Sequence, residues 1–413
     1  MKPSVQRVSA TGVAALSLMV PLLAPETIQA DSTGTCNGVS VTIPFNDVAG
    51  HGFFCMIATA WFTGLTNGTS PTTYGPDDTV TRGQMAAFIT RTGDQAAKRI
   101  SRRAALEQWG TPRLVDDGAG YNQVTATGAG PYGVASDGAD IWVANHDGQN
   151  VQRIRASDGK LLETWTGVVR PWAVIVANGS VFVTGGDQAN GSGFLYRINP
   201  RLPAGAVTTM SSTLGKCPTG LATDGFYVWT ANSCGASPSV SRVQVTNIPP
   251  ITTNFTAGIT ASNTLVYDGS SIWVAGGGSL LKLNENGTVA ATVALGASSP
   301  GKPVFDGENI WVPNSASVQV VRVKDTSGDP LSSPFLLANL TGNGLNGPHS
   351  AAFDGQRVLI TNATGSSLSL FRATDLRPLG AVGTGGADQP LGACSDGTSF
   401  WVALNAFGGV GRF

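Results

Sequence analysis

The chain has 413 residues, and 25 Lys and Arg against 26 Asp and Glu give it a formal net charge of −1. This balance offers no basic field to a nucleic acid, and a hydrophobic content of 41% excludes a disordered chain. The 54 glycines and the 12% of charged residues are typical of a fold with many tight turns and few exposed helices.

Residues 1–30 have the pattern of a signal peptide. Lys2 and Arg7 precede a mostly apolar stretch over 8–24, and the small residue Ala30 ends the segment. We therefore expect cleavage after Ala30 and a secreted protein. A transmembrane anchor is the weaker interpretation, because polar and turn-forming residues interrupt the apolar stretch at Ser9, Gly12, Ser17 and Pro21.

Residues 31–95 form a small module with two predicted helices. An apolar, helix-compatible run over 53–65 ends at Thr66-Asn67-Gly68, and Thr81 can cap a second helix that continues through Met85 and Phe88. Two short helices bury little core, so this module needs a disulfide or a partner surface.

Five cysteines suit an oxidising compartment. Cys36 and Cys55 lie in the small module, and Cys217 and Cys234 lie close together further along the chain, so we predict one disulfide in each pair. Cys394 remains as a buried free thiol inside an apolar strand.

The small module resembles the S-layer homology module of bacterial envelope proteins. The resemblance is carried by Phe45-Asn46-Asp47-Val48, Trp61, Gly64-Leu65, Tyr74-Gly75-Pro76-Asp77 and Val80-Thr81-Arg82-Gly83-Gln84-Met85-Ala86. It implies non-covalent attachment to cell-wall polysaccharide at the bacterial surface. Gln84 stands where the family usually has an acidic residue, and one copy is present where wall binding often uses three.

Three residues of this module are candidates for binding the wall glycan. The Arg82 guanidinium can hold an acidic glycan group with two parallel hydrogen bonds, while Asp47 offers a hydrogen bond and Trp61 a stacking face. A structural interpretation is equally open. In that case Arg82 pairs with Asp77 or Asp78, and Trp61 belongs to the core.

Residues 96–120 are predicted to form a helical connector and a linker, whose basic cluster around Arg102 is interpreted as a solvated helical face. The region that follows, 121–413, repeats one pattern seven times. Each copy has a short apolar strand, an Asp-Gly or Asn-Gly pair, an aromatic strand and a strand with a basic residue. The anchors lie 38 to 48 residues apart, at Asp137, Asn178, Asp224, Asp268, Asp306, Asp354 and Asp396.

This period predicts a mainly β protein with a seven-bladed β-propeller. The last repeat stops after its third strand, so we expect the segment 121–126 to supply the fourth and to close the ring. The Asp-Gly pairs predict two-residue hairpin turns. In five repeats a Trp follows the Asp by five residues, which indicates packing between blades.

The basic residue of each third strand has two interpretations. A ring of seven cations, such as Arg153 and Arg242, could hold a polyanion. The favoured alternative is that each stem packs on a neighbouring aromatic ring while its charged group pairs with a turn aspartate. Through the strand segments IWVAN, VWTAN, IWVPN and VLITN, the repeats resemble those of YVTN-type and NHL-like surface propellers. This resemblance implies a binding or assembly scaffold.

The segments entering the first strand of each blade should gather around the central channel. The residues there that differ between blades are Tyr132, Trp172, Lys302 and His349, and the loop after the second strand of the first blade adds His146. We predict a pocket there for a protein, peptide or glycan ligand. No metal or cofactor motif occurs in the sequence.

Three functions compete. The favoured one is a wall-attached binding or scaffold propeller. A streptogramin-lyase-like enzyme would use His146 or His349 together with carboxylates on a metal. A structural surface-layer component would instead present a smooth, uncharged face.

Overall fold

The computed structural model describes residues 31–36, 39–62, 66, 68–70, 72–86, 88, 123–186, 191, 193–234, 238–246, 249–256, 258–259, 264–296, 299–325, 327–386 and 388–413. The chain divides into two compact units, Met1–Ala97 and Lys98–Phe413. The predicted signal peptide and the predicted 96–120 connector lie outside the described residues. In the part of the chain that the structure describes, no helix is long and apolar enough to cross a membrane.

The first unit combines a hairpin with a helix. Strands β1 (Ser32–Cys36) and β2 (Val39–Ile43) pair antiparallel, and helix α1 (Phe54–Phe62) follows. The helix was predicted from the sequence, whereas the hairpin was not. Their shared core is small and consists of Ile43, Phe45, Val48, Phe54, Ile57 and Ala58.

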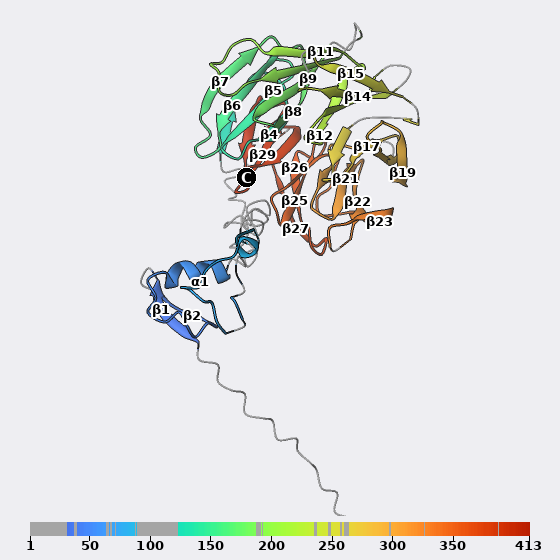
Figure 1. The fold of residues 1–413 in the computed structure, drawn as a ribbon. Coiled ribbons are helices and arrows are strands. Elements are labelled where there is room, and N and C mark those ends of the chain that lie inside the picture. Colours follow the sequence, from blue (N-terminus) through green and yellow to red (C-terminus); the bar gives the residue numbers. More distant parts are fainter. Residues whose placement is uncertain are drawn as a thin grey trace, which may run out of the picture. The chain divides into compact units, whose positions relative to one another are not determined.

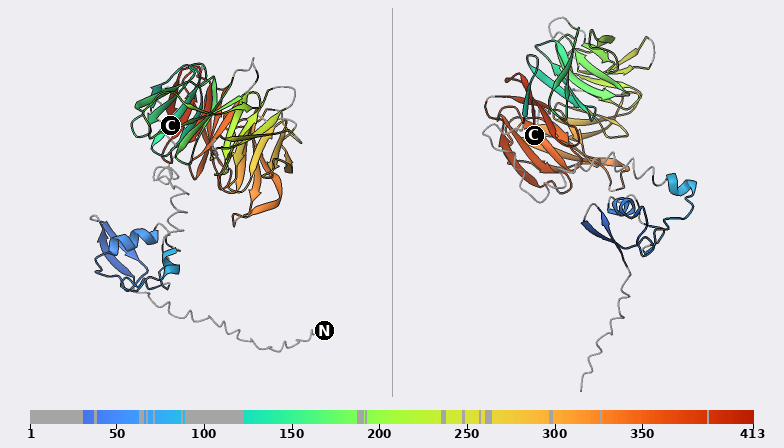
Figure 2. Two further views of the ribbon diagram at one scale, coloured as in Figure 1. Left: turned by 45° about the horizontal axis from the view of Figure 1, so that its top comes forward. Right: turned by 90° about the vertical axis from the view of Figure 1, so that its left-hand side faces the viewer.

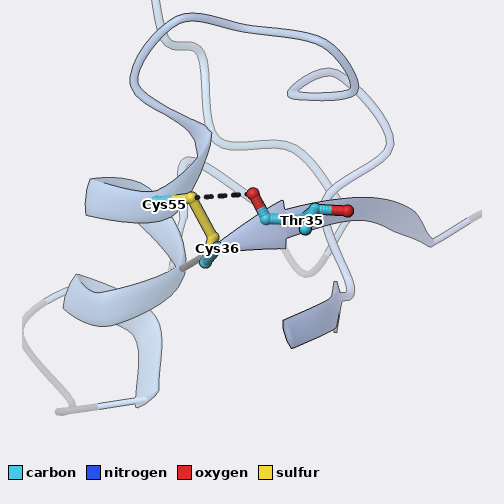
Figure 3. The surroundings of a disulfide bond; sticks show 3 residues. All are labelled: Thr35, Cys36 and Cys55. Atoms are coloured by element: carbon cyan, nitrogen blue, oxygen red, sulfur yellow. Dashed lines mark hydrogen bonds between the residues drawn. A yellow bond between two sulfur atoms is a disulfide. The ribbon is translucent and has the colours of Figure 1, made fainter. Parts of the chain in front are cut away.

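A disulfide links the hairpin to the helix, as predicted. Cys36 at the end of β1 bonds Cys55 in the first turn of α1, and the Cys55 sulfur lies 3.6 Å from the Thr35 carbonyl oxygen (Figure 3). The second predicted disulfide, Cys217–Cys234, is also present, in the third blade of the other unit. The two bridges therefore constrain different units.

The second unit is a seven-bladed propeller of four-stranded antiparallel sheets, which follow one another in chain order from green to red (Figure 1). The innermost strands are β4 (Pro131–Ser136), β8 (Pro171–Ala177), β12 (Pro218–Thr223), β16 (Thr264–Tyr267), β20 (Val304–Phe305), β24 (Pro348–Phe353) and β28 (Pro390–Ser395). The second strands are β5 (Asp140–Asn145), β9 (Ser180–Gly185), β13 (Val228–Asn232), β17 (Ile272–Gly276), β21 (Asn309–Asn314), β25 (Arg357–Asn362) and β29 (Phe400–Leu404).

Two further strands on the outer side complete each four-stranded blade. Figure 2 shows the propeller from two further directions. The third strands are β6 (Asn150–Arg155), β10 (Gly193–Ile198), β14 (Ser239–Gln244), β18 (Ser279–Leu283), β22 (Ser317–Lys324), β26 (Ser367–Arg372) and β30 (Gly409–Arg412). The fourth strands are β7 (Leu161–Thr166), β11 (Thr208–Leu214), β15 (Ile251–Phe255), β19 (Val289–Ala294), β23 (Pro330–Leu340), β27 (Pro378–Gly383) and β3 (Gln123–Ala126).

The ring closes as predicted. Strand β3 pairs antiparallel with β30, placing Val124 opposite Gly411 and Thr125 opposite Val410. The innermost strands of neighbouring blades also pack on one another, and β28 packs against β4. The first and last strands of the propeller thus share one blade.

The anchor aspartates hold their turns differently from the prediction. A two-residue turn occurs at Asn178-Gly179, where both residues have positive φ, 50° and 69°. At Asp137 the carboxylate instead accepts the backbone N–H groups of Ala139 and Asp140, at 2.9 and 2.7 Å, which holds a longer loop. The two-residue prediction is therefore wrong for the Asp-Gly repeats, because the Asp side chain replaces part of the strand pairing.

The same aspartates explain the repeated tryptophans. The second carboxylate oxygen accepts the indole N–H of the Trp five residues on, at 2.6–3.0 Å, in the pairs Asp137–Trp142, Asp224–Trp229, Asp268–Trp273, Asp306–Trp311 and Asp396–Trp401. All five rings are buried between blades. In the sixth repeat the Leu359 side chain has no hydrogen-bond donor, and the Asp354 carboxylate pairs with Arg357 instead, at 2.8 Å.

Replacing Trp273 with Phe should therefore destabilise the propeller by about 3 kcal/mol, since the fully buried Asp268 carboxylate loses the indole hydrogen bond. Trp165→Phe is the matched control, because this buried indole bonds no carboxylate in the described part of the chain. Chemical denaturation of both variants would measure the difference. Equal losses of stability would contradict this role of the Asp–Trp pair.

The basic residues of the third strands pack on their own blade, and three of them also reach the next one. Arg153, Arg242 and Arg412 donate to the backbone carbonyls of Pro200, Glu285 and Ala156, respectively. Arg153, Arg242, Lys282 and Arg412 lie over the tryptophan of their blade at 5.4–5.9 Å. The expectation that they pair with turn aspartates needs a correction, because the Trp N–H groups occupy those carboxylates. Arg153 pairs with Asp140 and Glu163 instead, and Arg322 pairs with Glu308.

Candidate functional site

The innermost strands begin with an irregularity that shapes the candidate site. Pro131 lies opposite Asn145, whereas Gly133 lies opposite Ala144, so Tyr132 is an extra residue in the ladder. The same shift occurs after Pro171, Pro218, Pro348 and Pro390. Such bulges re-aim the extra side chain. The residues at these positions include Tyr132, Trp172 and His349.

The strands approach one another closely at this level. A Cβ atom on Gly133 would lie 2.5 Å from the Trp172 carbonyl oxygen, and one on Gly301 would lie 2.0 Å from the His349 carbonyl oxygen. Because these neighbours are backbone atoms, larger residues at either position would force the strands apart. The backbone of the channel wall is therefore tightly fixed where the bulged side chains emerge.

A pocket of about 380 Å³ opens at this end of the channel, and all seven blades contribute to its lining. Four of the five predicted residues line it, namely Tyr132, Trp172, Lys302 and His349. Glycines, Ser and Thr residues make up much of the remainder, and the described lining contains no carboxylate. The volume suits a small organic ligand.

The fifth predicted residue, His146, lies behind the lining rather than in it. Its ring packs on Trp172 at a centroid distance of 4.1 Å, and its Nδ1 lies 2.8 Å from the Asp147 carboxylate. The other ring nitrogen, Nε2, is buried, and so is the indole nitrogen of Trp172. Neither has a hydrogen-bond partner among the described residues.

Tyr132 lies at the centre of the aromatic group. Its ring meets Trp172 edge to face at 5.0 Å and His349 at 5.6 Å, and its hydroxyl oxygen is 3.4 Å from His349 Nε2. Burial raises the pKa of the Tyr132 phenol. The phenol therefore stays protonated and can donate or accept a hydrogen bond.

Lys302 is the cation of the pocket. Its backbone pairs with β24, since its N–H donates to the His349 carbonyl at 2.8 Å and its carbonyl accepts from Ala351 at 2.9 Å. The ammonium reaches the Ala393 carbonyl of the seventh blade at 3.5 Å, and in the described part of the chain it forms no ion pair. Burial lowers the pKa of Lys302.

Cys394 is a free thiol, as predicted, but it is half-buried rather than buried, and it packs against the core cluster that contains Trp401 and Ala403. Desolvation raises its pKa to about 12, so the thiol is protonated at neutral pH. It therefore supplies no anion to the neighbouring Lys302.

His349 gives the propeller an acid-sensitive point. Burial, followed by the charge of Lys302, lowers the pKa of His349 to about 4 from an ordinary 6.5, against an opposing contribution from the Leu391 carbonyl. The unfolded chain thus binds the proton more tightly, and stability present above pH 6.5 is lost as the pH falls toward 4. The loss amounts to at most roughly 3 kcal/mol.

His349→Gln should therefore flatten the decline in the free energy of unfolding between pH 6.5 and 4. His146→Gln serves as the control and should retain the decline. Denaturant titrations at a series of pH values would measure both. If His349→Gln showed the same decline in the free energy of unfolding with falling pH as the wild type, the result would contradict the idea that His349 is buried as a neutral ring.

In the small unit, two of the predicted glycan-binding residues contact their own module. The Asp47 carboxylate accepts the backbone N–H groups of Tyr74 and Gly75 at 2.8–3.0 Å. Desolvation opposes ionisation there, but these hydrogen bonds outweigh it and lower the pKa of Asp47. Trp61 is half-buried and meets Phe45 edge to face at 6.5 Å. Their roles in glycan binding remain predictions.

Arg82 is exposed and forms no ion pair among the described residues, so the alternative interpretation, a pairing with Asp77 or Asp78, is not seen there. It opens a helix that Thr81 caps. The Thr81 hydroxyl accepts the Gln84 N–H at 3.2 Å, and the Gln84 side-chain carbonyl accepts the Thr81 N–H at 2.8 Å. Gln84 thus completes this reciprocal cap as an acidic residue would.

A second, smaller pocket of about 250 Å³ lies beside this cap and was not predicted. Tyr74, Asp78, Thr79 and Gln84 contribute to its lining. The motif residues of the module signalled this position, but the loop conformation that hollows it depends on contacts such as that of Asp47 with Tyr74.

Comparison with known proteins assigns the small module. Residues 44–86 match the S-layer homology domain, a family of domains that bind cell-wall polysaccharide, and this match implies association with the cell surface or cell wall. No curated protein matches this chain. The protein thus combines an S-layer homology domain with a seven-bladed propeller.

Solved structures match the propeller at low identity. Hydrazine synthase of Kuenenia stuttgartiensis is 15% identical, with a TM-score of 0.55, over 71% of this chain and 97% of that chain. Virginiamycin B lyase of Staphylococcus aureus is 17% identical, with a TM-score of 0.53, over 70% and 98%. The Cps50 (Swd1) β-propeller domain of Myceliophteria thermophila is 12% identical, with a TM-score of 0.55, over 71% and 98%. These likenesses show the fold alone.

Proposed function

We propose that this protein is secreted, attaches non-covalently to bacterial cell-wall polysaccharide through its S-layer homology domain, and displays the propeller as a ligand-binding domain. The observation that carries the first part is the match of residues 44–86 to a wall-binding family. We assign residues 1–30, 31–95, 96–120 and 121–413 to the signal peptide, the anchoring module, the connector and the propeller.

Arg82 is the residue we expect to hold the glycan. It is exposed, it makes no ion pair in the described part of the chain, and it lies next to the capped start of a helix. A guanidinium can bind an acidic sugar substituent through two parallel hydrogen bonds. The neighbouring pocket, with the Tyr74 ring and the polar groups of Asp78 and Gln84, offers room for an adjoining sugar.

The pocket at the channel mouth supports a binding role for the propeller. It gathers residues that differ from blade to blade, including Tyr132, Trp172 and His349. A smooth, uncharged face would favour the interpretation as a purely structural surface-layer component. The hollowed mouth, which contains the half-buried Lys302, supports ligand binding instead.

Co-sedimentation with purified bacterial walls tests the attachment. We expect the mature chain from residue 31 to pellet with intact walls but not with walls stripped of their polysaccharide, and Arg82→Ala to remain in the supernatant. Arg201→Ala, which removes an exposed arginine of the propeller, is the matched control. Equal pelleting of all three proteins would refute the role of Arg82, and equal pelleting on stripped walls would refute polysaccharide attachment.

A streptogramin-lyase-like enzyme is the second candidate function. The observation in its favour is that His146 and His349 both contact Tyr132, with centroid distances of 6.4 and 5.6 Å. The contact of His146 Nδ1 with Asp147 leaves Nε2 without a hydrogen-bond partner among the described residues, as a base requires, but the ring lies behind the pocket lining and would have to turn toward a substrate. In the described residues, no three His, Cys, Asp or Glu side chains gather as a metal site would require. Incubation with virginiamycin B, followed by liquid chromatography and fragmentation mass spectrometry of His146→Gln and wild-type samples, would detect ring opening by elimination, which leaves the mass unchanged.

A further inference from the structure

We propose that the pocket at the channel mouth binds a small ligand that carries a carboxylate on a ring, with Lys302 as the counter-ion and Tyr132 and Trp172 as the surface for the ring. This inference rests on the proposed binding role of the propeller and names the ligand class of the same pocket.

The seven repeats provide an internal comparison for Lys302. Lys302 is bridged to Ser350 of the next blade, and Ser350 is the residue at which its own innermost strand resumes regular pairing after the bulge. Lys302 therefore holds the equivalent position in the fifth blade. The other six blades place a small residue there: Gly133, Ala173, Gly220, Thr264, Ser350 and Gly392. A residue that serves the blade recurs in every blade. Lys302 therefore serves something other than blade structure.

The charge of Lys302 is not balanced by the described part of the protein. The lining contains no carboxylate, and the titratable groups near the ammonium are His349 and the protonated Cys394. The Ala393 carbonyl, at 3.5 Å, is its one hydrogen-bond partner in that part of the chain. Removing an unpaired cation from water is unfavourable, and an anionic ligand reverses this cost.

The remaining lining favours a ring attached to the anion. Tyr132 and Trp172 both line the pocket and meet edge to face at 5.0 Å, which fixes their orientation. A ring-bearing acid can pair its carboxylate with the Lys302 ammonium and lay its ring against these two aromatic side chains. Either a sugar acid or an aromatic acid has this chemistry.

Two matched pairs of probes test the proposal with the mature protein in solution. The pairs are D-glucuronate with D-glucose and phenylacetate with phenylacetamide, and each pair differs in its negative charge. Calorimetry should show that the acid of at least one pair binds about tenfold more tightly than its neutral partner, because a charge-assisted hydrogen bond is involved. The pair that shows the preference identifies a sugar acid or an aromatic acid as the source.

Lys302→Met should abolish this preference while preserving the length of the side chain, and Lys160→Met, at an exposed position, should retain it. Failure of both acids to bind at millimolar concentrations, equal binding of acid and neutral partner, or an unchanged preference in Lys302→Met would each overturn the proposal. The wild-type comparison needs no variant, so a folding defect of Lys302→Met does not obscure it. Wall attachment is measured separately, so failure here leaves the anchoring role standing.

Discussion

Replacing both Cys36 and Cys55 with Ser is expected to unfold the S-layer homology domain at 37 °C and to leave the propeller folded. The disulfide closes a loop with a sequence separation of 19 and fastens the β1–β2 hairpin to α1. Loss of such a bridge costs about 3 kcal/mol. A core of six buried residues cannot offset a loss of this size.

Limited proteolysis with mass analysis would measure the effect. The double variant should be cleaved within residues 31–95 under conditions in which the wild-type module resists, and wall attachment should be lost with it. The matched control replaces Cys217 and Cys234. This bridge lies in the third blade, which shares large hydrophobic clusters with the blades on either side. A Cys36/Cys55 variant that keeps both protease resistance and wall attachment would show that the hairpin and helix hold together without the bridge.

Introducing proline at both Val124 and Thr125 is expected to open the propeller ring. These residues lie opposite Gly411 and Val410 of β30. Because the N–H groups of adjacent strand residues point in opposite directions, one of the two faces β30, and a pair of prolines removes it. The direct cost is about 3 kcal/mol. The total loss should be larger, because β3 is the strand that brings the start of the propeller to its end.

Prolines at Ala291 and Thr292 are the matched control. These residues lie in β19, the fourth strand of a blade whose strands are continuous in sequence. Differential scanning calorimetry should show a much lower and broader transition for the β3 variant than for the β19 variant. Equal losses would mean that the closure contributes no more than any other fourth strand.

The sequence predicted the blade number because each repeat carries its own packing signals. Every Asp–Trp pair is local, with partners five residues apart, so its spacing is visible in the chain. The closure by β3 was predictable because the last repeat lacked a strand. The β1–β2 hairpin was predictable but was missed. Asn37-Gly38, a strong two-residue hairpin signal, separates its two strands of five residues, and the second of them, VSVTI, alternates apolar and polar residues.

The candidate site was predictable in position but not in detail. Tyr132, Trp172 and His349 follow prolines that begin innermost strands, and this placed them at the channel mouth. The displacement of His146 behind Trp172 depends on distances between blades. So does the absence of a carboxylate near Lys302 in the described lining. Distances of this kind are set by the packing of the whole ring and leave no local pattern.

One measurement tests the division of roles between the two units directly. Intact walls are loaded with the mature protein and then equilibrated with radiolabelled glucuronate and, separately, phenylacetate, and the protein and the label in each pellet are quantified. We predict that the wild-type pellet contains both the protein and one of the labels. The Lys302→Met pellet should contain the protein without label, and the Arg82→Ala pellet should contain neither. Release of the Lys302 variant from the wall, or retention of the Arg82 variant, would contradict the assignment of wall attachment to one unit and ligand binding to the other.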